Sequence, residues 1–78
     1  MWREKNNILV IKKEFQSFEK AIIFINKVAR LAKEQNHHPK IYNSHNKVKL
    51  QLTTHDMGNK ITEKDKKLAS DIEKLIGS

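Results

Sequence analysis

Three histidines are the residues of this chain whose types and spacing could support chemistry. His37 and His38 are adjacent and precede a proline, while His55 is followed directly by Asp56. An imidazole with an unperturbed pKa of about 6.5 can both donate and accept a proton near neutral pH. Three such side chains facing one pocket could perform a paired acid and base step without a metal. Asp56 could orient His55 or raise its basicity, whereas the adjacent pair should diverge in direction.

Two other interpretations of these histidines stay open at this point. Histidines in loops or on the surface often have no role in chemistry. A metal site is the second alternative, but the spacing from His37-His38 to His45 and on to His55 matches no standard zinc pattern, and the chain has no cysteine. The sequence therefore predicts that no metal is bound.

The segment before the histidine pair is expected to form a strand and then a helix. The run Ile8-Leu9-Val10-Ile11, continued to Phe15, is β-branched and apolar at its start, which is typical of a strand. Ser17 is a suitable N-cap for a helix from Phe18 to Gln35. The helix must end near Asn36, because a proline at position 39 disfavours helical geometry in the residue before it.

One side of this helix is apolar. Residues that recur at three- and four-residue spacing predict a buried stripe, namely Phe18, Ala21, Ile22, Ile25, Val28, Ala29 and Ala32. Ile23, Phe24 and Leu31 make this stripe wider than one face of a sheet requires. Part of the excess could form an interface with another copy of the chain.

The second half of the chain predicts a hairpin and a closing helix. Lys40-Ile41-Tyr42 is expected to be a short strand, and Asn43 to Asn46 has the composition of a turn. Lys47 to Thr54 alternates polar and apolar residues, as a half-buried strand does. Gly58-Asn59 is a second turn. A helix from about Glu63 to Ile76 should follow.

Both ends of that last helix carry recognisable signals. Thr62-Glu63-Lys64-Asp65 is similar to a capping box with Asp in place of Glu or Gln, and Gly77 is expected to stop the helix. The element order of strand, helix, strand, strand, helix predicts an α+β fold. We expect a two-layer sandwich in which both helices pack on one face of an antiparallel sheet. Lys47, Lys49 and Gln51 would then face water, and open sheet edges could pair between subunits.

The size of the chain favours self-association. Its 78 residues make one small domain, 1–78, which buries a modest share of its surface and is therefore marginally stable alone. Disulfides cannot supplement the core because there is no cysteine, so a homodimer or homotetramer is the expected solution. The sequence has no apolar run of membrane-spanning length and no apolar signal segment at its start, so we expect a cytoplasmic protein, with the nucleus as the alternative.

The net charge of +7 comes from sixteen basic and nine acidic residues. Such a charge can indicate a nucleic-acid partner. The basic residues are nevertheless dispersed along the sequence, and only Arg3 and Arg30 are arginine, the residue best suited to bidentate contacts. This dispersion argues against nucleic-acid binding.

The motifs around the histidines together resemble a known family, the pterin-4a-carbinolamine dehydratases. The resemblance covers roughly residues 8 to 76, and its specific part is the combination of His-His-Pro with Thr-His-Asp at this separation. The motifs that carry it are Asn36-His37-His38-Pro39, Tyr42-Asn43, Asn46-Lys47-Val48, Leu52-Thr53-Thr54-His55-Asp56, Gly58, Thr62, Asp65 and Leu68-Ala69. Phe15, Phe18, Ala21, Phe24, Val28 and Ala29 match the approach to the first helix of the family and that helix itself.

The resemblance implies a dehydratase that converts 4a-hydroxytetrahydrobiopterin to quinonoid dihydropterin and water, with neither a metal nor an organic cofactor. It implies catalytic roles for His37, His38 and His55. Either member of the adjacent pair would be the base and His55 the acid, with the assignment open. Contacts to the pterin would come from Pro39, Thr54 and Asp56. Members of the family form dimers or tetramers, and in animals the family also includes a dimerisation cofactor of a homeodomain transcription factor.

Two positions and one loop depart from the family pattern. Lys33 stands where an acidic residue is usual, and His45 stands where an aromatic residue is usual. The loop from Met57 to Ile61 is one residue longer than in close animal relatives, which moves Asp65 back. These departures keep a second reading open, in which the same fold serves as a non-catalytic interaction or dimerisation module.

Overall fold

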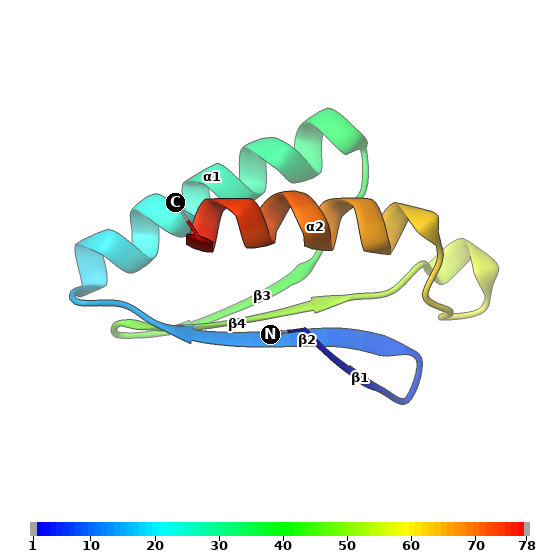
Figure 1. Ribbon diagram of the computed structural model, residues 1–78, viewed down its shortest axis with the longest axis horizontal. Coiled ribbons are helices and arrows are strands. Elements are labelled where there is room, and N and C mark those ends of the chain that lie inside the picture. The colour runs from blue at the N-terminus through cyan, green and yellow to red at the C-terminus, as the bar shows by residue number, and fades with distance from the viewer. Residues whose placement is uncertain (1, 78) are drawn as a thin grey trace.

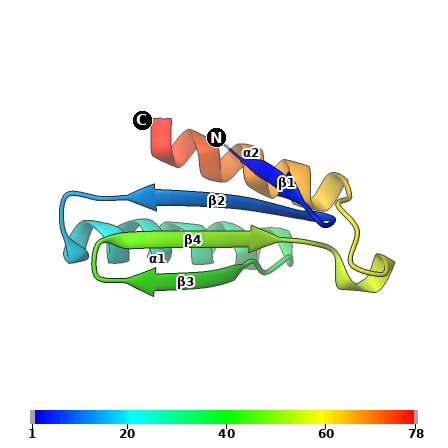
Figure 2. The same ribbon diagram turned by 90° about the horizontal axis from the view of Figure 1, so that it is seen from below.

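The computed structural model describes residues 2–77, which form two layers (Figure 1). One layer is a four-stranded antiparallel sheet, and the other consists of two helices on the same face of it. Figure 2 shows the strand order β1-β2-β4-β3. The elements in chain order are β1 (Arg3–Lys5), β2 (Ile8–Glu14), α1 (Phe18–Gln35), β3 (Lys40–Ser44), β4 (Lys47–Leu52), a 3-10 turn η1 (His55–Met57) and α2 (Glu63–Gly77). The predicted α+β sandwich is confirmed.

The pairing register decides which residues form the core. Ile11 pairs with Leu50, and Leu50 pairs with Ile41, so these three side chains share the face that the helices cover. Apolar residues of β2 and β4 meet those of both helices there. The buried core comprises Ile11, Ala21, Phe24, Val28, Val48, Leu50, Leu52, Leu68, Ala69 and Ile72. The apolar residues that alternate along the predicted long strand, Val48, Leu50 and Leu52, are therefore the ones that pack against the helices.

Helix α1 has the bounds predicted from the sequence. The Ser17 hydroxyl accepts a hydrogen bond from the Lys20 amide at 3.1 Å, which satisfies one free donor of the first turn. Asn36 ends the helix in the left-handed conformation, at φ 51° and ψ 43°. Two residues of the predicted buried stripe are exposed instead, Phe18 at 45% and Ala29, because they lie at the margins of the face that packs on the sheet. Of the apolar excess, Phe24 is buried in the core, whereas Ile23 is 53% exposed and lies outside it.

Strand β1 was not predicted from the sequence. It pairs with β2 through a two-residue turn in which Asn6 and Asn7 both have positive φ, 52° and 64°. Asparagine tolerates this conformation, and two such residues form the turn whose twist suits a tight hairpin. The three charged residues of β1 gave no pattern typical of a strand, whereas the pair Asn6-Asn7 could have indicated the hairpin turn.

Other element ends shift by a few residues. Strand β2 ends at Glu14 and β4 at Leu52, while β3 continues to Ser44 and leaves a turn at His45-Asn46. Helix α2 continues through Gly77 rather than stopping before it. Trp2 packs at the edge of the core, and its indole N–H donates to the Ala69 carbonyl at 3.1 Å. Across residues 2–77, neither helix is long and apolar enough to cross a membrane.

Candidate active site

His37 is held between the two helices by a buried carboxylate. The left-handed Asn36 turns the chain at the end of α1, and the His37 amide donates back to the Ala32 carbonyl at 3.0 Å. The ring then lies 2.5 Å, from Nε2 to Oδ1, from Asp65 in the first turn of α2. The His37 side chain is 11% exposed and that of Asp65 is fully buried. An ionised carboxylate can only accept, so Nε2 carries the proton and Nδ1 is the ring atom left to exchange one.

Asp65 stays ionised because its other oxygen is also hydrogen-bonded. The Thr62 amide donates to Oδ2 at 2.8 Å and the Thr54 hydroxyl at 2.7 Å. Burial raises the pKa of Asp65, but these hydrogen bonds and the bond from His37 outweigh burial and hold the pKa of the carboxyl below its ordinary value. Only half of the predicted capping box forms, since the Thr62 hydroxyl lies 2.7 Å from that of Thr54 instead of capping the helix.

His38 and His55 lie close together, away from the contact between His37 and Asp65. They line one small pocket at the end of the sheet, although seventeen positions separate them in the sequence. The remaining lining residues are Ile8, Lys40, Gln51 and Thr53. His37 instead lines a separate hollow beside Glu34, Lys64 and Lys67. His37 and His38 therefore line different spaces, which agrees with the expected divergence of the adjacent pair, and only His38 shares a pocket with His55.

The ring of His55 is held by an asparagine rather than by its neighbouring aspartate. His55 Nδ1 lies 2.7 Å from Asn59 Oδ1. With the amide oxygen facing the ring, Nδ1 donates, and Nε2 is free to take up or release a proton. Asn59 reaches this position because it and Gly58 both adopt left-handed backbone, at φ 60° and 72°. The expected orientation of His55 by Asp56 is thus replaced by a contact from the loop.

The residues expected to contact substrate lie in three different surroundings. Thr54 is 6% exposed and its hydroxyl is engaged by Asp65 and Thr62, so it supports the His37 carboxylate and is not free to bind a ligand. Pro39 is half-buried and Asp56 is exposed, and neither lines the pocket of His38 and His55. The contacts of a bound pterin with these residues stay a prediction.

Two of the three departures from the family pattern, His45 and Lys33, lie away from this pocket, whereas the loop from Met57 to Ile61 reaches it through Asn59. His45 is in the turn between β3 and β4, at the opposite end of the hairpin from His38 and His55. Lys33 is exposed in the last turn of α1. In the part of the chain that the structure describes, no group of three or more potential ligands is placed to hold a metal ion.

Two residues of the site were not recognised as such from the sequence. Asp65 appeared as a capping residue, and its second role depends on the approach of α1 to α2, which no local pattern encodes. Asn59 appeared as a turn residue. Its contact with His55 had a weak signal, because a polar side chain four residues after a histidine can turn back toward it across a 3-10 turn.

The fold and the site together define a class: a small α+β sandwich with histidines from the end of its first helix and the end of its last strand. Comparison with known proteins identifies the family. The model of the pterin 4 alpha carbinolamine dehydratase family matches residues 1–75, and the chain belongs to that family.

Individual relatives and solved structures agree with this assignment. A protein of Prochlorococcus marinus, provisionally named pterin-4-alpha-carbinolamine dehydratase, is 53% identical over 70 residues, 87% of this chain and 73% of its own. A protein of the same provisional name from Sulfurisphaera tokodaii is 43% identical over 75 residues, 96% of this chain and 80% of its own. The crystal structure of a transcriptional coactivator/pterin dehydratase from Brucella melitensis superposes with a TM-score of 0.89 at 29% identity, over 95% of this chain and 80% of that one.

A more distant structure shares the fold alone. It is a pterin dehydratase-like protein identified as a RuBisCO assembly factor in the alpha-carboxysome, with a TM-score of 0.79 and 23% identity. The superposition covers all of this chain and 89% of the other chain. The fold therefore also occurs in a protein that is named for assembly rather than for catalysis.

Proposed function

We propose that this chain is a 4a-hydroxytetrahydrobiopterin dehydratase that acts in tetrahydrobiopterin recycling. A base removes the proton from N5 of the pterin, and the electrons of that N–H bond form the C4a–N5 double bond. The C4a–O bond breaks at the same time, and an acid protonates the departing hydroxyl to give water. Two positioned proton-transfer groups are sufficient for this reaction, so we propose that it uses neither a metal nor an organic cofactor.

The observation that carries this proposal is the shared pocket of His38 and His55. A base and an acid must reach the same substrate at once, and these two side chains line one small hollow of about 20 Å³ from different segments, so the pterin would lie over this hollow rather than inside it. We assign the acid to His55, whose Nε2 is left free by the Asn59 contact, and the base to His38. His37, with Nδ1 as its exchanging atom, is the alternative base.

The decisive experiment follows the dehydration of chemically generated 4a-hydroxytetrahydropterin by ultraviolet absorbance. We expect the protein to exceed the spontaneous rate and the His55→Ala and His38→Ala variants each to lose about 10²-fold or more in kcat/KM, the usual contribution of a general acid or base. His45→Ala, at the far end of the hairpin, is the matched control and should keep full activity.

Each other outcome has a definite meaning. If His37→Ala loses kcat while His38→Ala changes only KM, the base is His37 and His38 binds the substrate. If the unaltered protein is no faster than buffer, the enzymatic proposal is wrong. The family fold would then serve as a non-catalytic interaction module in this chain.

The proposal includes self-association of the chain as a homodimer or homotetramer. Exposed apolar side chains on both layers support it, since Ile23 of α1 is 53% exposed and Ile41 of the edge strand β3 is 39% exposed. Strand β3 is also exposed along its whole length, which leaves backbone groups free to pair with another strand.

A further inference from the structure

The outer face of the sheet, which is the face away from the helices, gathers basic residues that are dispersed in the sequence. Arg3 pairs with Val10, and Lys12 pairs with Lys49, which pairs with Tyr42. Paired residues share a face and successive residues alternate, so the register assigns six basic side chains to this face, Arg3, Lys5, Lys12, Lys40, Lys47 and Lys49. Glu14 is the one acidic residue that the strands place among them.

The helix layer does not share this imbalance. Helix α1 has four basic and two acidic residues, and α2 has four of each. The Lys–carboxylate ion pairs found among residues 2–77 also lie on α2, where Lys66, Lys67 and Lys74 pair with Glu63 or Asp71. A general excess of lysine would be spread over both layers. The concentration of unneutralised charge on one face therefore indicates an anionic partner.

The basic face also has a hollow and an exposed aromatic ring. The hollow is lined by residues of β2, β3 and β4, and no helix residue lines it. Most of the lining residues belong to the outer face by register, namely Lys12, Glu14, Tyr42, Ser44, Lys47 and Lys49, and the others alternate with them along the same strands. Tyr42 is 47% exposed. The Lys49 ammonium lies 4.6 Å from the centroid of its ring, so a cation and an aromatic surface are presented side by side.

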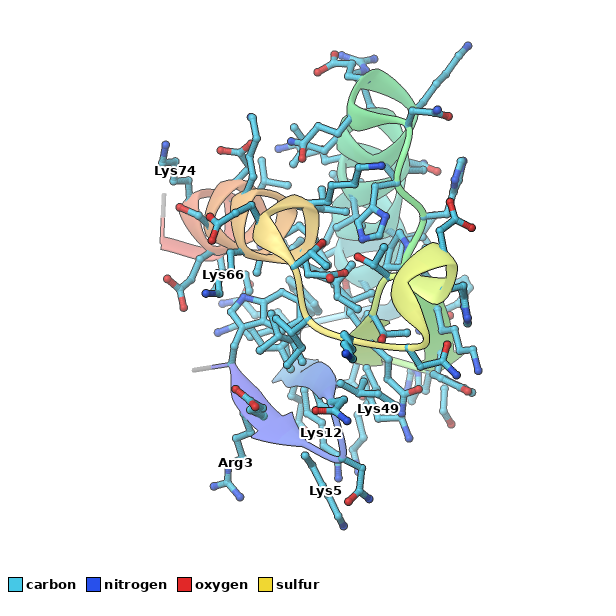
Figure 3. All side chains as sticks on the ribbon, turned by 90° about the vertical axis from the view of Figure 1, so that its right-hand side faces the viewer. Arg3, Lys5, Lys12, Lys49, Lys66 and Lys74 are labelled. Atoms are coloured by element: carbon cyan, nitrogen blue, oxygen red, sulfur yellow. The ribbon has the colours of Figure 1, made fainter. Side chains whose placement is uncertain are left out.

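We propose that this basic face binds single-stranded nucleic acid. Lysines in rows across three strands suit a phosphate backbone, and the Tyr42 ring offers a surface on which an unpaired base can stack. A duplex would use the lysines but not the ring. A lipid surface would need apolar side chains that insert, whereas Ile8 and Val10, the aliphatic residues of this face, are half-buried. Figure 3 shows labelled Arg3, Lys5, Lys12 and Lys49 on the sheet side of the molecule, and Lys66 and Lys74 at α2.

The test measures fluorescence anisotropy of a labelled single strand of about 15 nucleotides, long enough for one small sheet surface. The protein should bind it with an affinity that falls steeply between about 50 and 200 mM salt. Replacing both Lys12 and Lys49 with Gln should reduce the magnitude of the log–log salt slope by about 1.4, because each phosphate contact on a single strand contributes about 0.7. The matched control replaces Lys66 and Lys74 with Gln, which removes the same charge from α2 and should change the slope little.

The ring is tested separately. Tyr42→Leu should weaken binding at least about fivefold, the lower end of a base–aromatic stack, while Tyr42→Phe should retain it. Equal losses in the Lys12/Lys49 and Lys66/Lys74 variants would overturn the proposal, since binding would then follow net charge alone. So would tighter binding of a duplex of the same length, or binding of phosphatidylserine vesicles without binding of the oligonucleotide. The Lys12/Lys49 variant should keep its dehydratase rate, because neither residue lines the pocket of His38 and His55.

Discussion

Replacing Asp65 with Asn tests the interaction that fixes His37. The two side chains have the same shape, so the substitution changes charge and hydrogen bonding without leaving a cavity. The wild-type carboxylate accepts bonds from His37, Thr54 and the Thr62 amide while fully buried. An amide has one oxygen and one N–H₂ group. If the oxygen stays on His37, the N–H₂ group faces the Thr62 amide, and two donors oppose each other.

The magnitude follows from those contacts. A buried donor without a partner costs about 1–3 kcal/mol, and a hydrogen bond to a charged group contributes about 1.5–3 kcal/mol, part of which is lost with the charge. We expect the free energy of unfolding to fall by about 2–4 kcal/mol at pH 7. Because 1 kcal/mol shifts the melting temperature of a domain this small by about 4–8 °C, the loss should exceed about 8 °C.

The assay is urea unfolding followed by circular dichroism, repeated as a function of pH. The folded protein lowers the pKa of Asp65, so its stabilisation is complete above the ordinary value of 3.8 and is lost as the pH falls through the lower folded-state pKa. The difference between wild type and variant should therefore shrink on acidification. Asp71→Asn is the matched control. That carboxylate is 24% exposed, pairs with lysines on the surface and accepts a hydrogen bond from the Gln35 amide at 2.7 Å. An amide oxygen in its place can still accept from Gln35, so the substitution should cost less than about 1 kcal/mol. A variant of Asp65 within about 0.5 kcal/mol of wild type at pH 7 would refute the reasoning, because surface substitutions already reach that range.

Two further predictions concern the pocket and the assembly. Asn59→Ala should lower kcat with a smaller effect on KM, and it should shift the pH profile of kcat, because His55 Nδ1 loses its partner. An unchanged pH profile would mean that the contact does not position the ring. Circular dichroism would show whether the variant is folded. Sedimentation equilibrium should give a mass of two or four chains, and Ile23→Lys should lower it if α1 forms the contact. A single-chain mass for the unaltered protein would contradict the proposed self-association.

The sequence predicted the elements that local chemistry specifies. Ser17, the apolar stripe and the approach to Pro39 were enough to predict α1 with its observed bounds. The alternation in Lys47 to Thr54 predicted β4 and its buried face to within two residues. The charged strand β1 was not predicted, because it is stabilised by pairing with β2. A strand that is exposed on both faces shows no alternation of apolar and polar residues in its sequence.

The arrangement of the site was harder to predict from the sequence, because it depends on the directions in which side chains point and not on which residues are adjacent in the sequence. His37 and His38 differ by one position, yet the left-handed Asn36 sends the first toward α2 and leaves the second at the end of the sheet. The dispersion of the basic residues along the sequence likewise argued against nucleic-acid binding. Four strands in antiparallel register gather six basic residues on one face, and such a surface becomes visible only when the pairing is known.

The loop before α2, which the family resemblance implies is one residue longer than in animal relatives, leaves Asp65 in contact with Thr54 and His37. Thr54 and Lys60 form a bridge across the loop, with the Thr54 amide donating to the Lys60 carbonyl at 2.9 Å, so the segment between them closes on itself. Two consecutive left-handed residues, Gly58 and Asn59, bring the chain back within that closed segment. The bridge holds both ends of the loop together, and Thr54 at one end also donates to Asp65. One consequence is local: the same left-handed turn brings Asn59 to His55, so the loop that could have disrupted the site supplies one of its hydrogen bonds.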